Sequence, residues 1–289
     1  MNVLIVGSKG QLGRALAATA PASASIVCHD VDTLDITDPD AIAAVVAQAW
    51  PDVLFNAAAY TAVDKAESEE PQALAVNATA VGHLALAARD AGARLVHVST
   101  DFVFDGMAGV PYRPDSAPNP LSAYGRTKLA GEILAREGLG DAALIVRTAW
   151  VYAPTGGNFV RTMLRLMRER PEVRVVADQI GTPTYAPGLA RALWALAEQG
   201  ASGTHHYTDA GACSWYDFAV AIQEEAVAAG LLTKAVPVVP INTSDYPTPA
   251  RRPPYSVLDK TSMFALLGAP TPHWRSNLRT MIDGIKTDG

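Results

Sequence analysis

Short apolar runs alternate with amphipathic stretches along the first half of the chain. The runs are rich in β-branched residues, which is typical of parallel strands that are buried on both faces. The predicted strands are Val3–Val6, Ser25–Cys28, Val53–Phe55, Leu95–Val98 and Ala143–Arg147. The helical patterns between and after them are Arg14–Thr19, Pro39–Trp50, Asn77–Ala91 and Leu121–Ile133. Strands that alternate with helices predict an α/β fold with a doubly wound parallel sheet of the Rossmann type.

The second half of the chain contains shorter and more interrupted elements. The pattern predicts a helix at Phe159–Arg170, a strand at Val173–Val176, a Gly/Pro/Thr-rich loop at Asp178–Thr184, and helices at Pro187–Glu198 and Trp215–Ala229. This order suits a smaller α/β lobe whose loops close over a substrate. We therefore assign residues 1–150 to a dinucleotide-binding Rossmann domain. Residues 151–289 are assigned mainly to a C-terminal substrate-binding lobe, with parts of 185–235 packing back on the first domain.

Composition narrows the class of protein. Of 289 residues, 49% are hydrophobic and 18% charged, as in a globular enzyme, and the net charge is −6. There is no basic tract, so we expect neither a nucleic-acid nor a membrane partner. Met1–Gly7 lacks a charged n-region, and no apolar run approaches the roughly 20 residues that span a bilayer. With Cys28 and Cys213 as the only cysteines, a reducing compartment, the cytoplasm, is expected.

A glycine-rich turn follows the first strand directly. Gly7-Ser8-Lys9-Gly10-Gln11-Leu12-Gly13 joins that strand to the first helical pattern. Glycines let the backbone approach a pyrophosphate, whose charge is attracted by the unpaired N–H groups at a helix N-terminus. The spacing G-x-x-G-x-x-G differs from the general G-x-G-x-x-G fingerprint. Its place between a strand and a helix nevertheless favours a dinucleotide site over a turn that needs glycine for packing alone.

Acidic residues after the second strand bear on the choice of cofactor. Asp30, with Asp32 in reserve, stands about 20 residues past the glycines, where a carboxylate accepts hydrogen bonds from the adenosine ribose. A solvated loop acid is the alternative. Such an acid favours NADH, whereas Lys9 would suit the 2′-phosphate of NADPH, so both cofactors stay open. Asp35-Ile36 follows, and we expect its aspartate to reach the adenine amino group.

Small residues follow the third strand, at the edge where open α/β sheets place their ligands. Asn56-Ala57-Ala58-Ala59-Tyr60 lets the chain pass close to the phosphates and ribose of a cofactor, and Thr61–Glu67 leaves the strand end next to it. Asn77, which we place at the start of the next helix, is a further cofactor candidate. A capping amide or a helix-surface amide is an equal alternative for Asn77.

Tyr124 and Lys128 lie four residues apart in a predicted helix, and hence on one of its faces. An unperturbed tyrosine titrates at about pH 10, so it needs a nearby cation to act as an acid at neutral pH. Lys128 and an oxidised nicotinamide would supply that charge, which makes Tyr124 the predicted general acid for carbonyl reduction. Thr100, after the fourth strand, can hydrogen-bond the same carbonyl. The Tyr124/Lys128 spacing is a weak signal alone, and so is Thr100, but the three residues together favour catalysis.

These motifs resemble those of the extended short-chain dehydrogenase/reductases, on Gly7/Gly10/Gly13, Asn56–Ala59, Ser99-Thr100 and Tyr124/Lys128. Within that superfamily, the chain resembles the dTDP-4-dehydrorhamnose reductase family. The segments that carry this resemblance are Gly10–Gly13, Thr61–Glu67, Ser99–Phe104, Tyr124–Glu132, Arg147–Tyr152, Asn158-Phe159, Asp178–Thr184 and Tyr246–Pro253. The resemblance therefore spans nearly the whole chain.

The resemblance implies NAD(P)H-dependent reduction of a dTDP-linked 4-keto sugar to dTDP-L-rhamnose, the last step of dTDP-rhamnose biosynthesis. Together with the motifs above, it assigns catalysis to Thr100, Tyr124 and Lys128. The residues expected to bind the cofactor are Gly7, Lys9, Gly10, Gln11, Leu12, Gly13, Asp30, Asp35, Ile36, Asn56, Ala57, Ala58, Ala59, Tyr60, Asn77, Ser99, Tyr124, Lys128 and Trp150. Those expected to bind the substrate are Thr61, Val63, Thr100, Phe102, Tyr124, Trp150, Asn158 and Arg252.

A metal ion and the oligomeric state are the open points of this resemblance. Some members of the family bind Mg²⁺ through carboxylates at a dimer interface. Here Arg14-Ala15-Leu16 stands where an acid is expected after the glycine turn, so we assign no metal ligand and leave monomer and homodimer open. His205-His206 would point to opposite faces of a strand and is interpreted as structural.

Two other functions remain as alternatives. One is another nucleotide-sugar reductase or epimerase of the same superfamily, acting on a different sugar or base. The other is a non-catalytic regulatory subunit that keeps the fold. The intact set of Thr100, Tyr124 and Lys128 argues against the second alternative.

Overall fold

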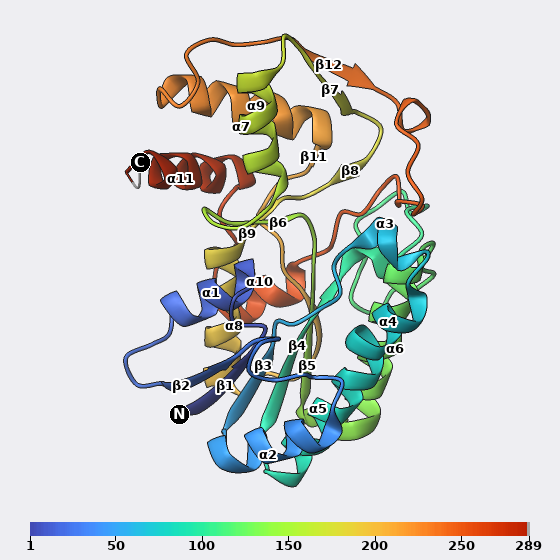
Figure 1. Ribbon diagram of the computed structural model, residues 1–289, viewed down its shortest axis with the longest axis vertical. Helices are drawn as coiled ribbons and strands as arrows, with labels where there is room; N and C mark the ends of the chain where they lie inside the picture. Colours follow the sequence, from blue (N-terminus) through green and yellow to red (C-terminus); the bar gives the residue numbers. More distant parts are fainter. Residues whose placement is uncertain (288–289) are drawn as a thin grey trace.

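The computed structural model describes residues 1–287 and has a parallel sheet of six strands at its centre (Figure 1). Across the sheet, the strands are β2 (Ser25–His29), β1 (Asn2–Val6), β3 (Val53–Asn56), β4 (Arg94–Thr100), β5 (Ala143–Thr148) and β10 (Gly203–His206). All neighbours pair in parallel. The strand order changes direction between β1 and β3, which confirms the doubly wound α/β prediction.

Alternate residues of β1 face opposite layers of helices, as the pleat of a strand requires. Val3 and Ile5 pack in the first core, and Leu4 and Val6 in the second. The first layer consists of α1 (Gln11–Ala18), α8 (Ala186–Gln199) and α10 (Thr261–Leu267), and the second of α2 (Pro39–Ala49), α5 (Ala80–Asp90) and α6 (Ala123–Leu139) (Figure 1). The sheet is therefore apolar on both faces, as its strands predict.

The chain returns to the central sheet after β5. Trp194 of α8 donates its indole N–H to the Leu16 carbonyl of α1 at 3.0 Å, and β10 pairs with β5. α10, near the end of the chain, packs on the same layer. The sheet and its helices thus include residues from both halves of the sequence. The functional division into residues 1–150 and 151–289 stays a prediction.

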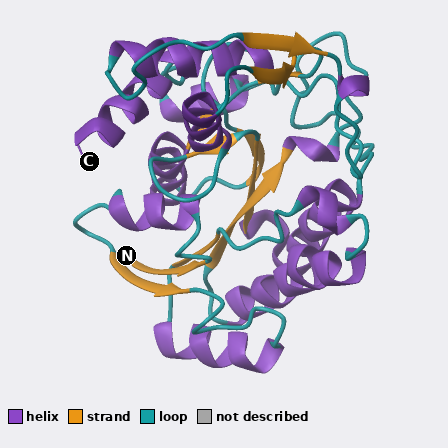
Figure 2. Ribbon diagram, turned by 45° about the horizontal axis from the view of Figure 1, so that its top comes forward, coloured by secondary structure: helices purple, strands orange, loops and turns teal. Residues whose placement is uncertain are grey.

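A smaller lobe stands beside the sheet, at the top of Figure 1. Its helices α7 (Phe159–Glu169), α9 (Trp215–Ala228) and α11 (Trp274–Thr287) share a third apolar core. Figure 2 shows the parallel pair β7 (Val173–Val176) and β12 (Val238–Ile241) apart from the central sheet. The short pairs are β8 (Ile180–Gly181) with β11 (Cys213–Ser214), and β6 (Val151–Tyr152) with β9 (Thr184–Tyr185).

Two predicted elements are wrong. Asp178–Thr184 is not a plain loop, because β8 and the first residue of β9 lie in it and pair with distant strands. Asn77 does not open a helix: helical structure begins at α4 (Glu70–Leu74), passes through a π-helical turn at Ala75–Thr79 and continues as α5. Pro71 stands in the first turn of α4, where proline favours helix initiation. Single π-helical turns of this kind often occur at functional sites.

The remaining helical segments are short. They are α3 (Val63–Ala66) and the 3₁₀ turns Asp101–Val103, Gly140–Ala142 and Thr243–Asp245. Within residues 1–287, no helix combines the length and the apolar character needed to cross a membrane.

Candidate active site

Thr100, Tyr124 and Lys128 come from two elements that meet at one end of the sheet. Thr100 is the last residue of β4, and Tyr124 and Lys128 lie one turn apart near the start of α6. The hydroxyl of Ser122 begins this helix by accepting the Gly125 N–H at 3.1 Å. Gly125 also permits the close approach of helix and strand end, since a Cβ there would stand 2.2 Å from the carbonyl oxygen of Phe102. The start of α6 is thereby fixed next to the end of β4.

Tyr124 is partly buried beside the end of β4. Its ring packs edge-on against Phe102, with 5.5 Å between the ring centroids. Burial raises the pKa of Tyr124 to about 12, an effect that the Thr100 hydroxyl opposes and Asp101 reinforces. The phenol therefore carries its proton at neutral pH, which is the form that a general acid needs, but its pKa is not lowered as the sequence leads us to expect, because burial outweighs the other effects.

Lys128 lies behind Tyr124 on the same face of α6 and is 1% exposed. Its Nζ donates to the Val98 carbonyl at 2.8 Å and lies 3.5 Å from His97 Nε2. Burial lowers the pKa of Lys128 to about 8, although the Glu132 carboxylate acts in the opposite direction. An amine with this pKa is charged in most molecules at neutral pH, so it can stabilise an anion nearby.

The three glycines of the turn differ in how closely the surrounding backbone packs against them. Gly7 has φ +79°, and a Cβ there would stand 2.5 Å from the Ala58 nitrogen; a Cβ on Gly13 would stand 2.1 Å from the Gly7 carbonyl oxygen. Packing against backbone thus explains Gly7 and Gly13. Gly10 is different, because the only contact that a Cβ there would make within 4 Å is the Gly7 oxygen, at 3.3 Å. Gly10 is also the N-cap of α1, which has neither a side-chain cap nor an acid in its first turn.

These features fit a bound pyrophosphate. The first N–H groups of α1 have no side chain to accept from them, and no carboxylate stands in the first turn to repel an anion. Gln11 and Leu12 begin the helix; the Leu12 side chain is buried in the first core. The start of α1 therefore presents backbone donors to a ligand.

The acids after β2 bind the glycine turn itself. Asp30 Oδ2 accepts the Lys9 backbone N–H at 2.6 Å, and the Lys9 ammonium forms an ion pair with Asp32. An acid and a cation thus meet at the point where the adenosine ribose is expected. Asp35 is exposed and accepts from the Thr37 N–H and hydroxyl, at 2.8 and 2.7 Å. The Ile36 side chain is buried in the second core, which leaves its backbone for any ligand contact.

Asn77 clamps the segment that follows β3. Its Oδ1 accepts the Tyr60 N–H at 2.9 Å, while its Nδ2 donates to the Tyr60 carbonyl at 3.1 Å and to the Thr127 hydroxyl at 3.2 Å. The side chain is fully buried, in the π-helical turn. Asn77 therefore ties Tyr60, at the end of this segment, to helix α6. Direct contact of its amide with a cofactor stays a prediction.

Trp150 connects the sheet to the smaller lobe. It follows β5 with φ +49°, a conformation that is rare for a residue other than glycine. Its ring stacks on Trp215 of α9, with 3.5 Å between the centroids and an interplanar angle of 11°. Phe159, the first residue of α7, lies 4.6 Å from Trp215 by the same measure. Gly181 makes room for this stack, since a Cβ there would stand 2.7 Å from the Trp150 ring.

A cleft of about 910 Å³ opens on the lobe beside this aromatic row. Trp215 and Phe159 line it, together with the cations Arg170, Arg174 and Arg252. Such a combination of aromatic rings and guanidinium groups suits a nucleotide, whose base stacks and whose phosphates take bidentate hydrogen bonds.

Arg252 and Asn158 are both engaged within the protein. The Arg252 guanidinium binds Asp64 through two hydrogen bonds, of 3.0 and 2.9 Å. Asn158 is the N-cap of α7, and its Nδ2 donates to Gln11 Oε1 at 2.9 Å, so it joins the lobe to the glycine turn. Of the other predicted substrate residues, Thr61 is exposed and Val63 half-buried, at the start of α3.

Comparison with known proteins places the chain among its relatives. The sequence profile described as RmlD substrate binding domain matches residues 1–287. The chain belongs to this family. It is 45% identical to the dTDP-4-dehydrorhamnose reductase of Burkholderia thailandensis over 286 residues, which cover 95% of this chain and 96% of the relative.

Two solved structures agree with this membership of the RmlD substrate binding domain family. A dTDP-4-dehydrorhamnose reductase from Clostridium acetobutylicum superposes with a TM-score of 0.93 at 41% identity, over 99% of this chain and 100% of that chain. One from Bacillus anthracis, in complex with NADP, gives a TM-score of 0.91 at 38% identity, over 96% of this chain and 97% of that chain. The similarity therefore extends through the sheet and the smaller lobe alike.

In this member of the RmlD substrate binding domain family, two polar residues outside the predicted catalytic set belong to this site: Asp101 contacts Thr100, and Ser256 acts on Asp101. Asp101 is 2% exposed and accepts the Thr100 hydroxyl at 3.1 Å. Burial raises the pKa of Asp101 to about 6, against hydrogen bonds from Ser256 and Thr100. The position of Asp101 after the strand end was an available signal. Ser256 comes from a distant loop and carries no such signal. Trp215 was likewise missed, because its partner Trp150 lies far away in the sequence.

The remaining polar candidates have structural surroundings. Ser99 is 3% exposed, and its hydroxyl helps to lower the pKa of Glu132. His206 is buried with its Nδ1 3.1 Å from the Tyr112 carbonyl, whereas His205 contacts the Ser262 hydroxyl at 3.1 Å. The part of the chain from 1 to 287 contains no group of three or more His, Cys, Asp or Glu side chains placed to hold a metal ion.

Proposed function

We propose that this chain reduces the C4 keto group of dTDP-4-dehydro-β-L-rhamnose to give dTDP-L-rhamnose, the last step of dTDP-rhamnose biosynthesis, with NADPH or NADH as the reductant. The observation that carries the proposal is the convergence of Thr100, Tyr124 and Lys128 at the end of the sheet that also holds the open glycine turn. Similarity to dTDP-4-dehydrorhamnose reductases along the whole chain supports this choice of substrate.

The residues that would hold the cofactor follow from the shape of the site. Gly10 and Gln11 at the N-terminus of α1 would take the pyrophosphate. The run from Ala57 to Ala59 would pass close to the phosphates and ribose, and Lys128 would hold the nicotinamide ribose. When bound, the reduced nicotinamide supplies the hydride. Because Asp32, after β2, pairs with Lys9 of the glycine turn, we propose that both cofactors are accepted, and the NADP complex of the relative from B. anthracis supports NADPH.

The side chains supply the proton that balances the hydride. As C4 of the sugar accepts the hydride, the electron pair of the C=O bond moves to oxygen, and Tyr124 donates its phenolic proton there, so that the ketone becomes an alcohol. The Thr100 hydroxyl orients the same oxygen. The Lys128 ammonium stabilises the phenolate that Tyr124 becomes. Water then restores the proton of Tyr124.

The cleft on the smaller lobe is the proposed place of the nucleotide. We propose that the stacked Trp150 and Trp215 bound the sugar and the base, and that Arg252 contacts the diphosphate. Gly181 lies close to both this stack and Ser256, since a Cβ there would stand 2.7 Å from the Trp150 ring and 2.9 Å from Ser256 Oγ. Ser256 also acts to lower the pKa of the buried Asp101, which follows Thr100.

The test is the consumption of reduced cofactor with enzymatically prepared dTDP-4-dehydro-β-L-rhamnose, followed by absorbance, with NADPH and NADH in separate runs. We expect one mole of cofactor oxidised for each mole of dTDP-L-rhamnose that mass spectrometry detects. The matched control is the same 4-keto sugar linked to UDP. UDP keeps the diphosphate and the pyrimidine ring and differs from dTDP only in the missing 5-methyl group and the added 2′-hydroxyl. If the aromatic slot contacts that methyl group, the UDP-linked substrate should be consumed more slowly, by about 10-fold or less, at equal concentration.

Other outcomes decide between the alternatives. Consumption with another nucleotide sugar, but not with the dTDP-linked ketone, would point to a different reductase or epimerase. Cofactor binding without turnover of any of these sugars would point to a regulatory subunit. Either result would overturn the proposal.

We further propose that the protein works in the cytoplasm, as a monomer or a homodimer. The support for the compartment is its cysteine chemistry, because Cys28 and Cys213 are both free thiols. Size-exclusion chromatography with light scattering distinguishes the two oligomeric states. A higher oligomer would contradict the proposal.

A further inference from the structure

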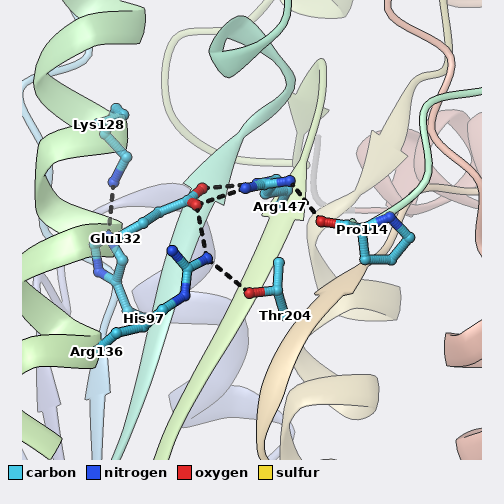
Figure 3. A network of polar contacts seen from close by, with 7 residues as sticks. All are labelled: His97, Pro114, Lys128, Glu132, Arg136, Arg147 and Thr204. Atoms are coloured by element: carbon cyan, nitrogen blue, oxygen red, sulfur yellow. Dashed lines mark hydrogen bonds and ion pairs between the residues drawn. The ribbon is translucent and has the colours of Figure 1, made fainter. Parts of the chain in front are cut away.

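A chain of polar contacts runs from the segment after β3 to Lys128. The Ala58 N–H donates to Asn56 Oδ1 at 3.1 Å, and Asn56 Nδ2 lies 3.2 Å from His97 Nδ1. The other ring nitrogen, His97 Nε2, lies 3.5 Å from Lys128 Nζ, at the long end of the hydrogen-bonding range (Figure 3). Asn56 and His97 are 1% and 0% exposed and stand opposite each other on β3 and β4. The ring is thus enclosed between the sheet and α6.

The Ala58 N–H determines which end of the Asn56 amide faces the histidine. Since a backbone N–H only donates, the atom that accepts it must be the amide oxygen, and the amide nitrogen must then point to His97. An amide nitrogen also only donates, so His97 Nδ1 must be the acceptor. A neutral imidazole that accepts at Nδ1 carries its proton on Nε2, and Nε2 is the nitrogen that faces Lys128.

The surroundings keep this ring neutral. Burial, followed by the charge of Lys128, lowers the pKa of His97 well below its usual range. The carboxylate that acts on Lys128 is Glu132, one turn along α6. Glu132 accepts from Arg147 of β5 at 2.8 and 2.7 Å and from Arg136 of α6 at 3.2 Å (Figure 3). Glu132 is therefore already held by two guanidinium groups.

We propose that His97 is a positioning residue for Lys128: its Nε2–H, oriented by Asn56, faces the amine and disfavours the additional proton of the ammonium form. Lys128 Nζ then lies between a donor, His97 Nε2–H, and an acceptor, the Val98 carbonyl. This inference rests on the proposed function, in which the charge of Lys128 controls how readily Tyr124 gives up its proton. Through Asn56, the backbone at Ala58 is coupled to that charge.

The ring tautomer is measured directly by ¹⁵N NMR of the full chain labelled with ¹⁵N-histidine, without cofactor or substrate. His97→Gln assigns the signal, because it removes one of six histidines. We expect a neutral ring with its proton on Nε2 across the range in which exposed histidines titrate, about pH 5 to 8. A ring that is protonated on Nδ1, or charged at neutral pH, would overturn the proposal.

Asn56→Asp reverses the contacts with a side chain of almost the same size. A carboxylate only accepts, so His97 Nδ1 must donate to it, and Nε2 becomes an acceptor for the Lys128 ammonium. We expect the NMR signal to change to the Nδ1–H tautomer. The alkaline limb of the kcat–pH profile should also move to higher pH by about one unit or more, because the ammonium form is now favoured.

The added negative charge is controlled by the double variant Asn56→Asp/His97→Leu. If the ring transmits the effect, this variant should lose most of the shift in the alkaline limb. A shift that persists in full without the ring would show that charge alone is responsible and would contradict the proposal.

Failure of this inference is separable from failure of the proposed function. If the wild-type chain does not reduce the dTDP-linked ketone, the proposed function is wrong, but the NMR measurement uses no substrate and still decides the tautomer. If Asn56→Asp does not fold, the tautomer in the wild-type chain decides in the same way.

Discussion

Glu132 and Arg147 form a bidentate ion pair in the interior: Arg147 Nε and Nη2 lie 2.8 and 2.7 Å from the two carboxylate oxygens, and the side chains are 0% and 2% exposed. The pair joins α6 to β5 (Figure 3). Arg147 also donates to the Pro114 carbonyl at 3.2 Å. The helix that carries Tyr124 and Lys128 is thereby attached to the sheet by charges that solvent does not screen.

Removing one partner of this pair should destabilise the fold strongly. Arg147→Met leaves the Glu132 carboxylate buried without its main partner, and we expect a loss of about 3–5 kcal/mol in the free energy of unfolding, measured with denaturant. The double variant Arg147→Met/Glu132→Leu should lose less, because no charge is left behind. Arg165→Met is the surface control, since its pair with Glu169 is exposed and is expected to contribute about 0–1 kcal/mol. Equal losses for Arg147→Met and Arg165→Met would contradict the role of burial.

Tyr124→Phe should lower kcat by about 10²–10⁴, because it removes the proposed proton donor and leaves the ring in place. The dissociation constant for NADPH, measured by fluorescence, should change little, since the phenol contributes mainly to the chemical step. Tyr216→Phe is the matched control on another helix, α9. If kcat with Tyr124→Phe equals that of the control, the role assigned to Tyr124 is refuted.

The sheet and the catalytic set could be predicted because local signals specify them. The apolar positions of β1 require burial on both faces, and the spacing of Tyr124 and Lys128 requires one face of a helix. The stack of Trp150 on Trp215 could not be predicted in this way. It depends on the positive φ of Trp150 and on the space left by Gly181, and neither is visible as a pattern in neighbouring residues.

The position of Asn77 is a second feature that the local sequence could not predict. The local sequence predicts that a helix begins at Asn77, because an asparagine side chain commonly caps a helix N-terminus. In the structure its amide instead satisfies the backbone of Tyr60, a residue on another segment, from within a π-helical turn. The tertiary hydrogen bonds that hold Asn77 decide its position, and they involve partners that no local window contains.

Asp209 should make stability depend on pH. It is 0% exposed, and burial raises its pKa to about 7, against opposing effects of Asn277, the Tyr185 N–H and Lys260. The unfolded carboxyl titrates at about 3.9. The native state therefore holds this proton more tightly, so the stabilising contribution is complete below about pH 4, falls as pH rises and is lost above about pH 7.

Asp209→Asn tests this dependence because the amide stays neutral at every pH. Its Tm relative to wild type, measured by calorimetry, should be more favourable at about pH 8 than at about pH 5, since only the wild type must bury a charge or bind a proton at high pH. Asp283→Asn, an exposed residue on α11, should show no such trend. A difference that is the same at both pH values would refute the assignment.

Gly7 and Gly92 distinguish two destabilising effects of replacing a glycine, backbone strain and steric overlap. Both have positive φ, +79° and +69°, but a Cβ on Gly7 would stand 2.5 Å from the Ala58 nitrogen, whereas Gly92 has nothing within 4 Å. Gly92→Ala should cost about 1–2 kcal/mol of unfolding free energy, from backbone strain alone. Gly7→Ala should cost about 1–3 kcal/mol more, from overpacking, and should weaken NADPH binding. Equal costs in denaturant unfolding would mean that the turn relaxes around the added methyl group.

Arg252→Ala should raise the KM for the dTDP-linked ketone about 10- to 100-fold, because a charge-assisted hydrogen bond to phosphate contributes about 1.5–3 kcal/mol. The KM for NADPH should stay the same, since Arg252 lines the cleft on the smaller lobe. Arg252→Lys keeps the charge but loses the two-pronged geometry seen with Asp64, so we expect an intermediate KM. Arg251→Ala removes the exposed neighbouring cation and is the matched control. The measurement is steady-state kinetics. If Arg251→Ala and Arg252→Ala raise the substrate KM equally, Arg252 acts by general attraction of the phosphates, and the proposed direct contact is wrong.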